Sequence, residues 1–239
     1  VSQNRTHAEI EKTKNLRWFH PSSTQKKWIL VHSELNSSEV ERYQKSGLFV
    51  CAYIWSHALL SLDWYRYAYY DQTLSPGKYT QKMFLIYALG QTGTRQYRKE
   101  FLQNLGPVAE HCQIGSFSSK VSSNSSAEYN AFDVNHTAIN VVLETVVDSR
   151  IHLTEKTLRP IAVGQPFILG AGTGSLQYLQ KYGFKTFSPW IDESYDAEYD
   201  TNKRLDKIQK EMHRLSSMPK NQFEQIYSEC LKIAQYNHF

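Results

Sequence analysis

The sequence lacks a long apolar run. None of its segments approaches the roughly 20 consecutive apolar residues that a transmembrane helix requires, so we expect no membrane segment in this chain. Its first residues, VSQNRTHAEIEKTK, are polar and charged, and we therefore expect no signal peptide. These features favour a cytoplasmic protein. Four N-x-[ST] sequons, at Asn4, Asn36, Asn124 and Asn135, keep a secretory lumen as the alternative.

The sequence also has few cysteines and a small net charge. The three cysteines (Cys51, Cys112 and Cys230) are far apart and form no CxxC pair, so we expect packed thiols and neither a disulfide framework nor a zinc site. The formal net charge is only +4, which suits an anionic ligand but is too small to indicate nucleic-acid binding by itself. The hydrophobic content of 41% is sufficient for a packed core.

Predicted strands and helices alternate along much of the chain, and from residue 82 onward this alternation predicts an α/β fold with a doubly wound, Rossmann-type parallel sheet. We expect an N-terminal region over 1–80 and a Rossmann-like domain over 81–239. Strands are predicted at 27–32, 82–88, 139–145 and 166–169, the first and last of them buried, with another strand ending at 187. Helices are predicted at 38–44, 95–105, from 154 to a turn at Gly164, at 175–182, and over 202–238 with a break near Pro219.

Three further segments carry expectations of their own. Residues 1–25 are predicted to be a polar arm with some helix, and the serine-rich residues 116–126 to be a long loop. The glycine-rich stretch 170–175 precedes a predicted helix but lacks the lysine that follows the last glycine of a P-loop. We therefore interpret it as a tight turn.

The most informative segment is Thr154-Glu155-Lys156, where a helix is expected to begin. Free backbone amides at a helix N-terminus attract anions, and a lysine there also favours one. A carboxylate beside it can bind ribose hydroxyls, while the ammonium and the amides bind phosphate. The segment therefore predicts a binding site for a sugar nucleotide. The alternative is an ordinary first helical turn in which Glu155 simply complements the helix dipole.

The order of motifs resembles a known family. INVVLET, RIHLTEKTLRPIAVGQPFILG and GFKTF are similar to the Phe-Glu-Asn, Tyr-x-Thr-Glu-Lys, Pro-x-x-x-Gly and Ser-Phe-Ile/Val segments of the α1,3/4-fucosyltransferases. Upstream, TRQYRKEFLQNL resembles the family's arginine-containing helix, and WILVHSELNS takes the place of its acidic acceptor-side loop. The resemblance extends over roughly residues 27–215 and is best in the donor-binding C-terminal half. It implies a compact GT-B glycosyltransferase.

The resemblance assigns roles to the donor-binding residues. Arg98 and Lys156 would reach the donor phosphates and Glu155 the ribose. Thr145 and His152 would lie near the base or ribose, at positions where the family has Asn and Tyr. Arg95, one turn before Arg98, is the competing phosphate ligand, and Arg98 itself could be a solvated helix residue.

Acceptor-side roles fall on other residues. Glu34, in the loop after the first strand, would be the general base, or else only an acid that precedes a helix. His57, Asp63 and Arg66 form a polar set within an aromatic segment, and Asp63 and Arg66 could bind the acceptor. Arg150 and Arg159 flank the helix start and could bind phosphate, but they are interpreted as solvated surface residues.

The predicted enzyme is an inverting, metal-independent glycosyltransferase that transfers a sugar from a nucleotide-diphosphate sugar. A GDP-sugar, and GDP-fucose in particular, is the best single candidate. The sequence has no Asp-x-Asp pair of the kind that holds Mn²⁺ or Mg²⁺ in many sugar transferases, so we expect neither a metal nor a separate cofactor. The acceptor would be a glycan, a protein or a modified DNA base. The alternative from another class is a non-catalytic module that binds sugar nucleotides or glycans.

Overall fold

The computed structural model describes residues 28–47, 49–77, 81–115 and 128–239. The predicted polar arm at 1–25 and the predicted serine-rich loop at 116–126 lie outside these residues. The chain divides into a smaller unit (Val1–His32 and Ser38–Ala52) and a larger one (Ser33–Ser37 and Tyr53–Phe239). The division falls near residue 53 and not at the predicted boundary of 80, because α3 (Ser56–Trp64) and the segment after it pack with the larger unit.

The elements of the smaller unit are β1 (Trp28–His32), α2 (Ser38–Lys45) and β2 (Phe49–Tyr53), with β1 and β2 hydrogen-bonded in one sheet. Helix α2 buries Val40 and Tyr43, as its amphipathic pattern predicts. The prediction that β1 is buried is wrong, because Ile29 is 76% exposed and Val31 57% exposed. Periodicity locates a strand but does not show whether another element covers it.

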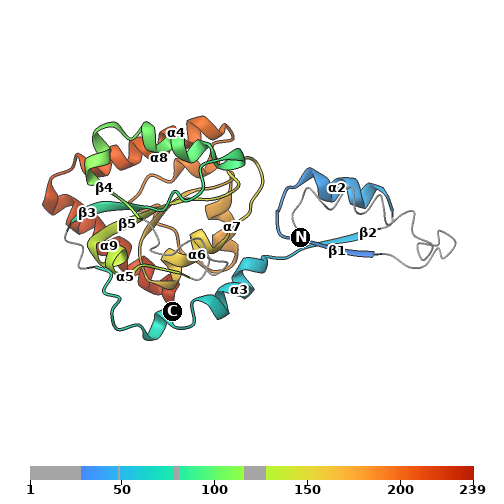
Figure 1. Cartoon of the computed structure of the whole chain (residues 1–239), viewed down its shortest axis with the longest axis horizontal. Coiled ribbons are helices and arrows are strands. Elements are labelled where there is room, and N and C mark those ends of the chain that lie inside the picture. The colour runs from blue at the N-terminus through green and yellow to red at the C-terminus, as the bar shows by residue number, and fades with distance from the viewer. Residues whose placement is uncertain (1–27, 48, 78–80, 116–127) are drawn as a thin grey trace. The chain divides into compact units, whose positions relative to one another are not determined.

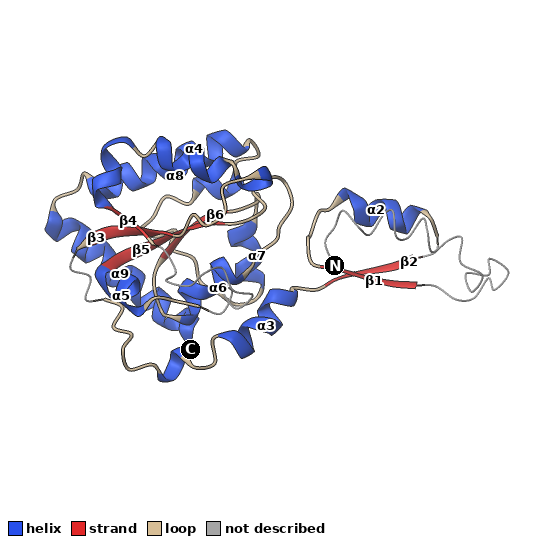
Figure 2. Cartoon of the chain, in the orientation of Figure 1, coloured by secondary structure: helices blue, strands red, loops and turns tan. Residues whose placement is uncertain are grey.

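The larger unit is built on a four-stranded parallel sheet with the order β4-β3-β5-β6 (Figure 2). Its strands are β3 (Lys82–Ile86), β4 (Cys112–Ile114), β5 (Thr137–Leu143) and β6 (Phe167–Gly170). Its α-helices are α3 (Ser56–Trp64), α4 (Tyr97–Gln103), α5 (Ala131–His136), α6 (Glu155–Ala162), α7 (Ser175–Lys181), α8 (Thr201–Ser216) and α9 (Lys220–His238). Short 3₁₀ helices are η1 (Ala68–Tyr70), η2 (Gly93–Arg95), η3 (Gly106–His111) and η4 (Ser194–Ala197).

Helices cover both faces of this sheet. Figure 1 shows α4 and α8 on one face and α5, α6 and α9 on the other. Every residue of β5 and β6 is buried as a result, which explains their uninterrupted apolar sequences. The predicted α/β fold with a Rossmann-like parallel sheet is therefore confirmed. The strand order reverses between β3 and β5, and in such sheets ligands collect beyond the carboxyl ends of the strands.

Two local predictions have different outcomes. The helical tail is confirmed as α8 and α9, which are separated at Pro219. The predicted strand ending at Phe187 is absent from the described residues, and this segment is a loop. Phe187 is fully buried, and its amide donates to the Glu193 carboxylate and not to a neighbouring strand. An apolar residue that fills the core does not require a strand.

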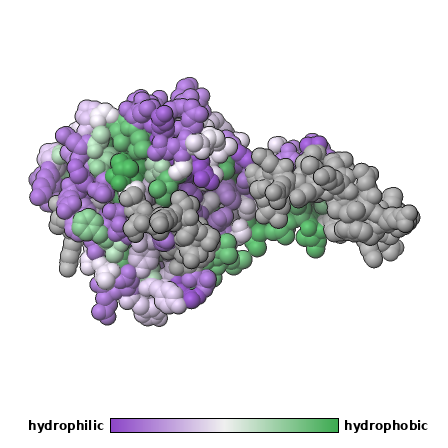
Figure 3. Space-filling model, in the orientation of Figure 1, coloured by the Kyte–Doolittle hydropathy of each residue, from purple (hydrophilic) through white to green (hydrophobic). Residues whose placement is uncertain are grey.

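Part of the apolar surface remains exposed. Leu59, Leu60 and Leu62 on α3 are all exposed, and Figure 3 shows an apolar stretch of surface over this helix. Cys112 and Cys230 are buried free thiols, and burial raises the pKa of each to about 12. These two cysteines are packed thiols, as predicted.

Candidate functional site

A buried carboxylate organises the edge of the sheet after β5. Glu144 is 0% exposed and accepts hydrogen bonds from the Thr154 amide (2.8 Å), the hydroxyls of Thr154 and Thr157 (2.7 Å each) and the Thr145 amide (3.2 Å). Because a buried charge is tolerated only when it is hydrogen-bonded, these donors hold Glu144 and the first turn of α6 together. Sequence reasoning placed Thr145 in the site but overlooked Glu144.

Helix α6 begins where the sequence predicts. The Thr154 hydroxyl caps it by accepting from the Lys156 amide (3.4 Å), and Glu155 and Lys156 form its first turn. The Lys156 ammonium donates to the Glu155 carboxylate (2.5 Å) and to the Thr154 hydroxyl (3.1 Å). The two side chains are only 16% and 20% exposed. The sequence predicts that the Lys156 ammonium binds an anion. In the structure this anion is the carboxylate of the preceding residue, Glu155.

The ammonium also controls the charge of Glu155. Burial raises the pKa of this carboxyl, but the adjacent Lys156 ammonium outweighs burial and holds the pKa down at about 2. Glu155 is therefore ionised at neutral pH. A negative charge at the N-terminus of α6 is also favoured by the helix dipole.

Two histidines complete the cluster. His57, in the first turn of α3, places its Nε2 atom 3.9 Å from the Glu155 carboxylate, and its ring meets that of His152 at 5.2 Å between centroids. Burial and the nearby His152 lower the pKa of His57, so this imidazole is neutral at pH 7. His152 lies with Nδ1 3.3 Å from the Ser33 carbonyl oxygen. The structure thus unites the predicted residues Glu155, Lys156 and His152.

Hydrogen bonds anchor the segment that carries His57 to the α6 region. The Trp55 indole donates to the Leu153 carbonyl (2.9 Å), and the Tyr65 hydroxyl donates to the Glu155 carbonyl (3.1 Å). The sequence grouped His57 with Asp63 and Arg66, but the structure separates them. Asp63 and Arg66 are exposed and pair with each other, apart from the described residues of the cluster. Their predicted role in acceptor binding is not supported by this placement.

Glu34 forms an ion pair with Arg150. Leu35 and Ile151 form an antiparallel bridge, with 3.0 Å between nitrogen and oxygen in both hydrogen bonds. This bridge brings Glu34, which is 4% exposed, to 2.9 Å from the Arg150 guanidinium. Arg150 also binds Asp148 at 2.6 Å. Arg150 is therefore engaged in an ion-pair network and is not the solvated surface residue that was predicted.

The Arg98 side chain is buried and bound to backbone carbonyl groups. It is 1% exposed, and its guanidinium donates to the carbonyl oxygens of Leu89, Gly90 (3.3 Å) and Leu143 (2.7 Å). Leu143 is the last residue of β5, and Leu89 and Gly90 follow β3. Arg98 therefore links the segments at the carboxyl ends of β3 and β5, where the strand order reverses. The predicted contact between Arg98 and donor phosphates is not supported. Arg159 is likewise 4% exposed and not a surface residue.

Replacing Arg98 should therefore affect folding and not ligand binding. Arg98→Ala would leave the carbonyl groups of Leu89, Gly90 and Leu143 without this donor, and a buried unpaired polar group costs about 1–3 kcal/mol. We expect denaturant unfolding to show a loss of at least about 3 kcal/mol. Arg95→Ala, at an exposed position, is the matched control and should change stability by less than about 0.5 kcal/mol. Wild-type stability of Arg98→Ala together with weakened GDP binding would restore the phosphate role.

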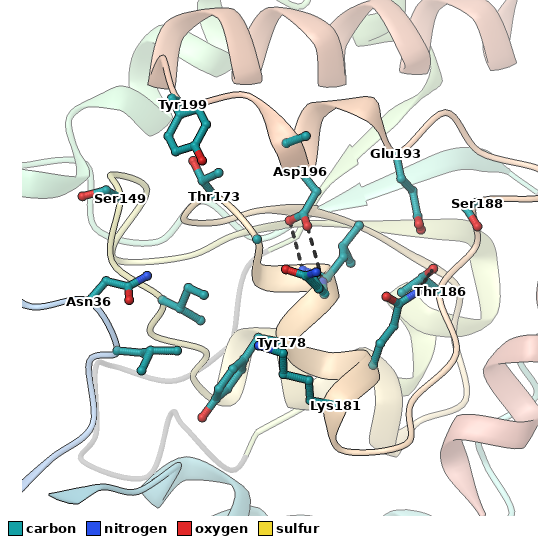
Figure 4. Close-up of a pocket in the computed structure, with 17 residues that line it drawn as sticks. Asn36, Ser149, Thr173, Tyr178, Lys181, Thr186, Ser188, Glu193, Asp196 and Tyr199 are labelled. Carbon is teal, nitrogen blue, oxygen red and sulfur yellow. Dashed lines mark hydrogen bonds between the residues drawn. The ribbon is translucent and has the colours of Figure 1, made fainter.

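The loops after β5 and β6 border a cavity of about 940 Å³ (Figure 4). The glycine-rich turn lies at its edge and is a tight turn, as predicted: Gly174 has φ +78° and precedes α7. At Gly172 a Cβ atom would lie 1.8 Å from the Arg150 carbonyl oxygen, so only glycine fits. Arg204, which is 1% exposed, donates to the carbonyls of Val147 and Ala171 and fixes the two loops to α8.

The chain was compared with known proteins at three levels. No protein-family model, curated protein or solved structure matches it. Among the described residues, no helix is both long and apolar enough to cross a bilayer. The same residues contain no group of three or more His, Cys, Asp or Glu side chains that could hold a metal ion.

Proposed function

We propose that the chain is an inverting glycosyltransferase that binds a nucleotide-diphosphate sugar at the N-terminus of α6. The observation that carries this proposal is the half-buried Glu155–Lys156 pair at a capped helix start beyond the carboxyl end of β5. A carboxylate and an ammonium fixed side by side match a ribose next to a phosphate. The four-stranded parallel sheet is compatible with one Rossmann-like domain of a GT-B enzyme. We propose that the whole chain is a compact glycosyltransferase of the GT-B type.

Donor binding would rearrange the pair. A diphosphate would replace the Glu155 carboxylate as the partner of the Lys156 ammonium, and the released carboxylate would accept hydrogen bonds from the ribose hydroxyls. Because Arg98 is occupied by backbone carbonyls and the Lys156 amide by the Thr154 hydroxyl, the Lys156 ammonium would be the main group that stabilises the leaving diphosphate. His152 and Thr145, both partly buried beside the helix start, are the proposed contacts for the base or ribose.

The acceptor hydroxyl must lose a proton as it attacks the anomeric carbon. We propose Glu34 as the general base, because a carboxylate can accept this proton directly. Its pairing with Arg150 gives the side chain a fixed orientation. His57 is the second candidate, because it is neutral at pH 7 and lies within the cluster.

The proposal is tested by release of nucleoside diphosphate. Purified protein is incubated with GDP-fucose and other GDP- and UDP-sugars, each with a glycan, a protein or a duplex containing hydroxymethylated bases as acceptor. We expect acceptor-dependent GDP release that persists in excess chelator, since the Lys156 ammonium takes the role of a metal. Donor binding without transfer to any acceptor would favour the non-catalytic binding module. A large loss of activity in chelator that Mn²⁺ restores would show that diphosphate stabilisation depends on a metal.

A further inference from the structure

The 940 Å³ cavity has no assigned ligand. Its size falls within the roughly 300–1,000 Å³ of small-molecule sites. Residues of the 144–154 loop, the glycine-rich turn, α7 and the 186–199 segment line it, and Figure 4 shows polar side chains around its rim. None of Glu155, Lys156 and His57 is among the described lining residues. The cavity is therefore a second site candidate next to the α6 cluster.

The charges of the lining argue against a phosphate ligand. Two carboxylates, Glu193 and Asp196, face one ammonium, that of Lys181. Asp196 accepts from the amides of Leu176 (3.0 Å) and Gln177 (3.4 Å), drawn as dashed lines in Figure 4, so these amides of α7 are already bonded. Burial raises the pKa of Glu193 to about 7, which makes this carboxyl both a hydrogen-bond donor and an acceptor near neutral pH.

The rest of the lining suits hydroxyl groups. The side chains of Asn36, Ser149 and Gln177 make no hydrogen bond to other described residues, so their amide and hydroxyl groups remain available to a ligand. Tyr199 is 81% exposed at the rim, so its ring is open to a ligand that stacks on it. Amides, hydroxyls, carboxyls and an exposed ring together are the groups that bind neutral sugars.

We propose that this cavity binds a neutral sugar unit, which under the proposed function would belong to the acceptor. The uncharged ligand would take hydrogen bonds from Asn36, Ser149 and Gln177 and would stack on Tyr199. Nucleotides would bind at the α6 cluster and leave the cavity open. An acceptor sugar held here would be recognised by groups that play no part in donor binding.

Saturation-transfer NMR tests the proposal with methyl glycosides of glucose, galactose, mannose, N-acetylglucosamine and fucose at millimolar concentration. We expect transfer to at least one glycoside in wild-type protein and a loss of about fivefold in affinity for Tyr199→Ala, the worth of one aromatic contact. Gln177→Ala should weaken binding as well. Tyr70→Ala is the matched control: this tyrosine is 76% exposed but lies on η1, outside the cavity, so the variant should bind normally.

Competition experiments with GDP distinguish a failure of the cavity proposal from a failure of the proposed function. We expect GDP not to displace the glycoside, and Lys156→Ala to keep the sugar signal even if it binds no nucleotide. Failure of both GDP and UDP to bind any form of the protein would overturn the proposed function alone. Absence of transfer to every glycoside, equal transfer in Tyr199→Ala, Gln177→Ala and wild type, or displacement of the sugar by GDP would overturn the cavity proposal.

Discussion

Lys156→Ala is expected to lower the affinity for GDP by roughly 10- to 150-fold, the equivalent of one lost charge-assisted hydrogen bond. The ammonium is held by Glu155 and Thr154 at the start of α6, so its position is set before any ligand arrives. A preorganised charge of this kind binds phosphate without a large ordering cost. Isothermal titration calorimetry of wild type and variant with GDP measures the change.

The control for this variant is Lys232→Ala. Lys232 also pairs with a glutamate, Glu229, at 2.6 Å, but the pair lies on α9 and Lys232 is 66% exposed. Its removal should leave GDP affinity unchanged, because a surface pair on α9 takes no part in the α6 cluster. If Lys156→Ala remains folded and binds GDP as tightly as wild type, the Glu155–Lys156 pair is only an intrahelical contact.

Glu34→Gln is expected to lower turnover by roughly 10²–10⁴, the usual contribution of positioned proton transfer, while GDP affinity stays near wild type. The amide keeps the size of the carboxylate and can still accept a hydrogen bond from Arg150, so a cavity would not explain the loss. The rate of GDP release at saturating donor and acceptor gives this comparison, and its pH profile should lose the limb that reports the base.

Asp148→Asn separates proton transfer from the positioning of Arg150. Both Asp148 and Glu34 bind the Arg150 guanidinium, at 2.6 and 2.9 Å, but Asp148 is half exposed and has no proposed role in catalysis. Its variant should retain most of the wild-type turnover. An equal loss in both variants would show that Glu34 acts by orienting Arg150. Full activity in Glu34→Gln would leave His57 as the base.

The sequence predicts well the parts of the fold that depend on local signals. Strands β3, β5 and β6 are apolar runs bounded by turns, and the start of α6 follows from the capping preference of Thr154 and the charges after it. These features require only neighbouring residues. The Glu155–Lys156 pair could be located for the same reason.

Side chains that bind distant backbone could not be predicted in this way. Arg98 has the same sequence pattern whether it reaches a phosphate or the carbonyls of Leu89 and Leu143, and only the packed sheet shows which. His57 joins Glu155 across 98 positions of the chain, so no spacing rule connects them. Phe187 was assigned to a strand because it is apolar, although it has no strand to pair with among the described residues.

The contact at Gly172 limits how this protein can diverge during evolution. A methyl group there would overlap the backbone carbonyl of Arg150, and backbone atoms cannot be exchanged by mutation. No second substitution nearby can therefore compensate for the loss of this glycine unless the turn itself is rebuilt. Lineages that acquire a different ligand preference would have to change the side chains around the cavity, such as Gln177 and Tyr199, and keep the glycine that joins the two loops.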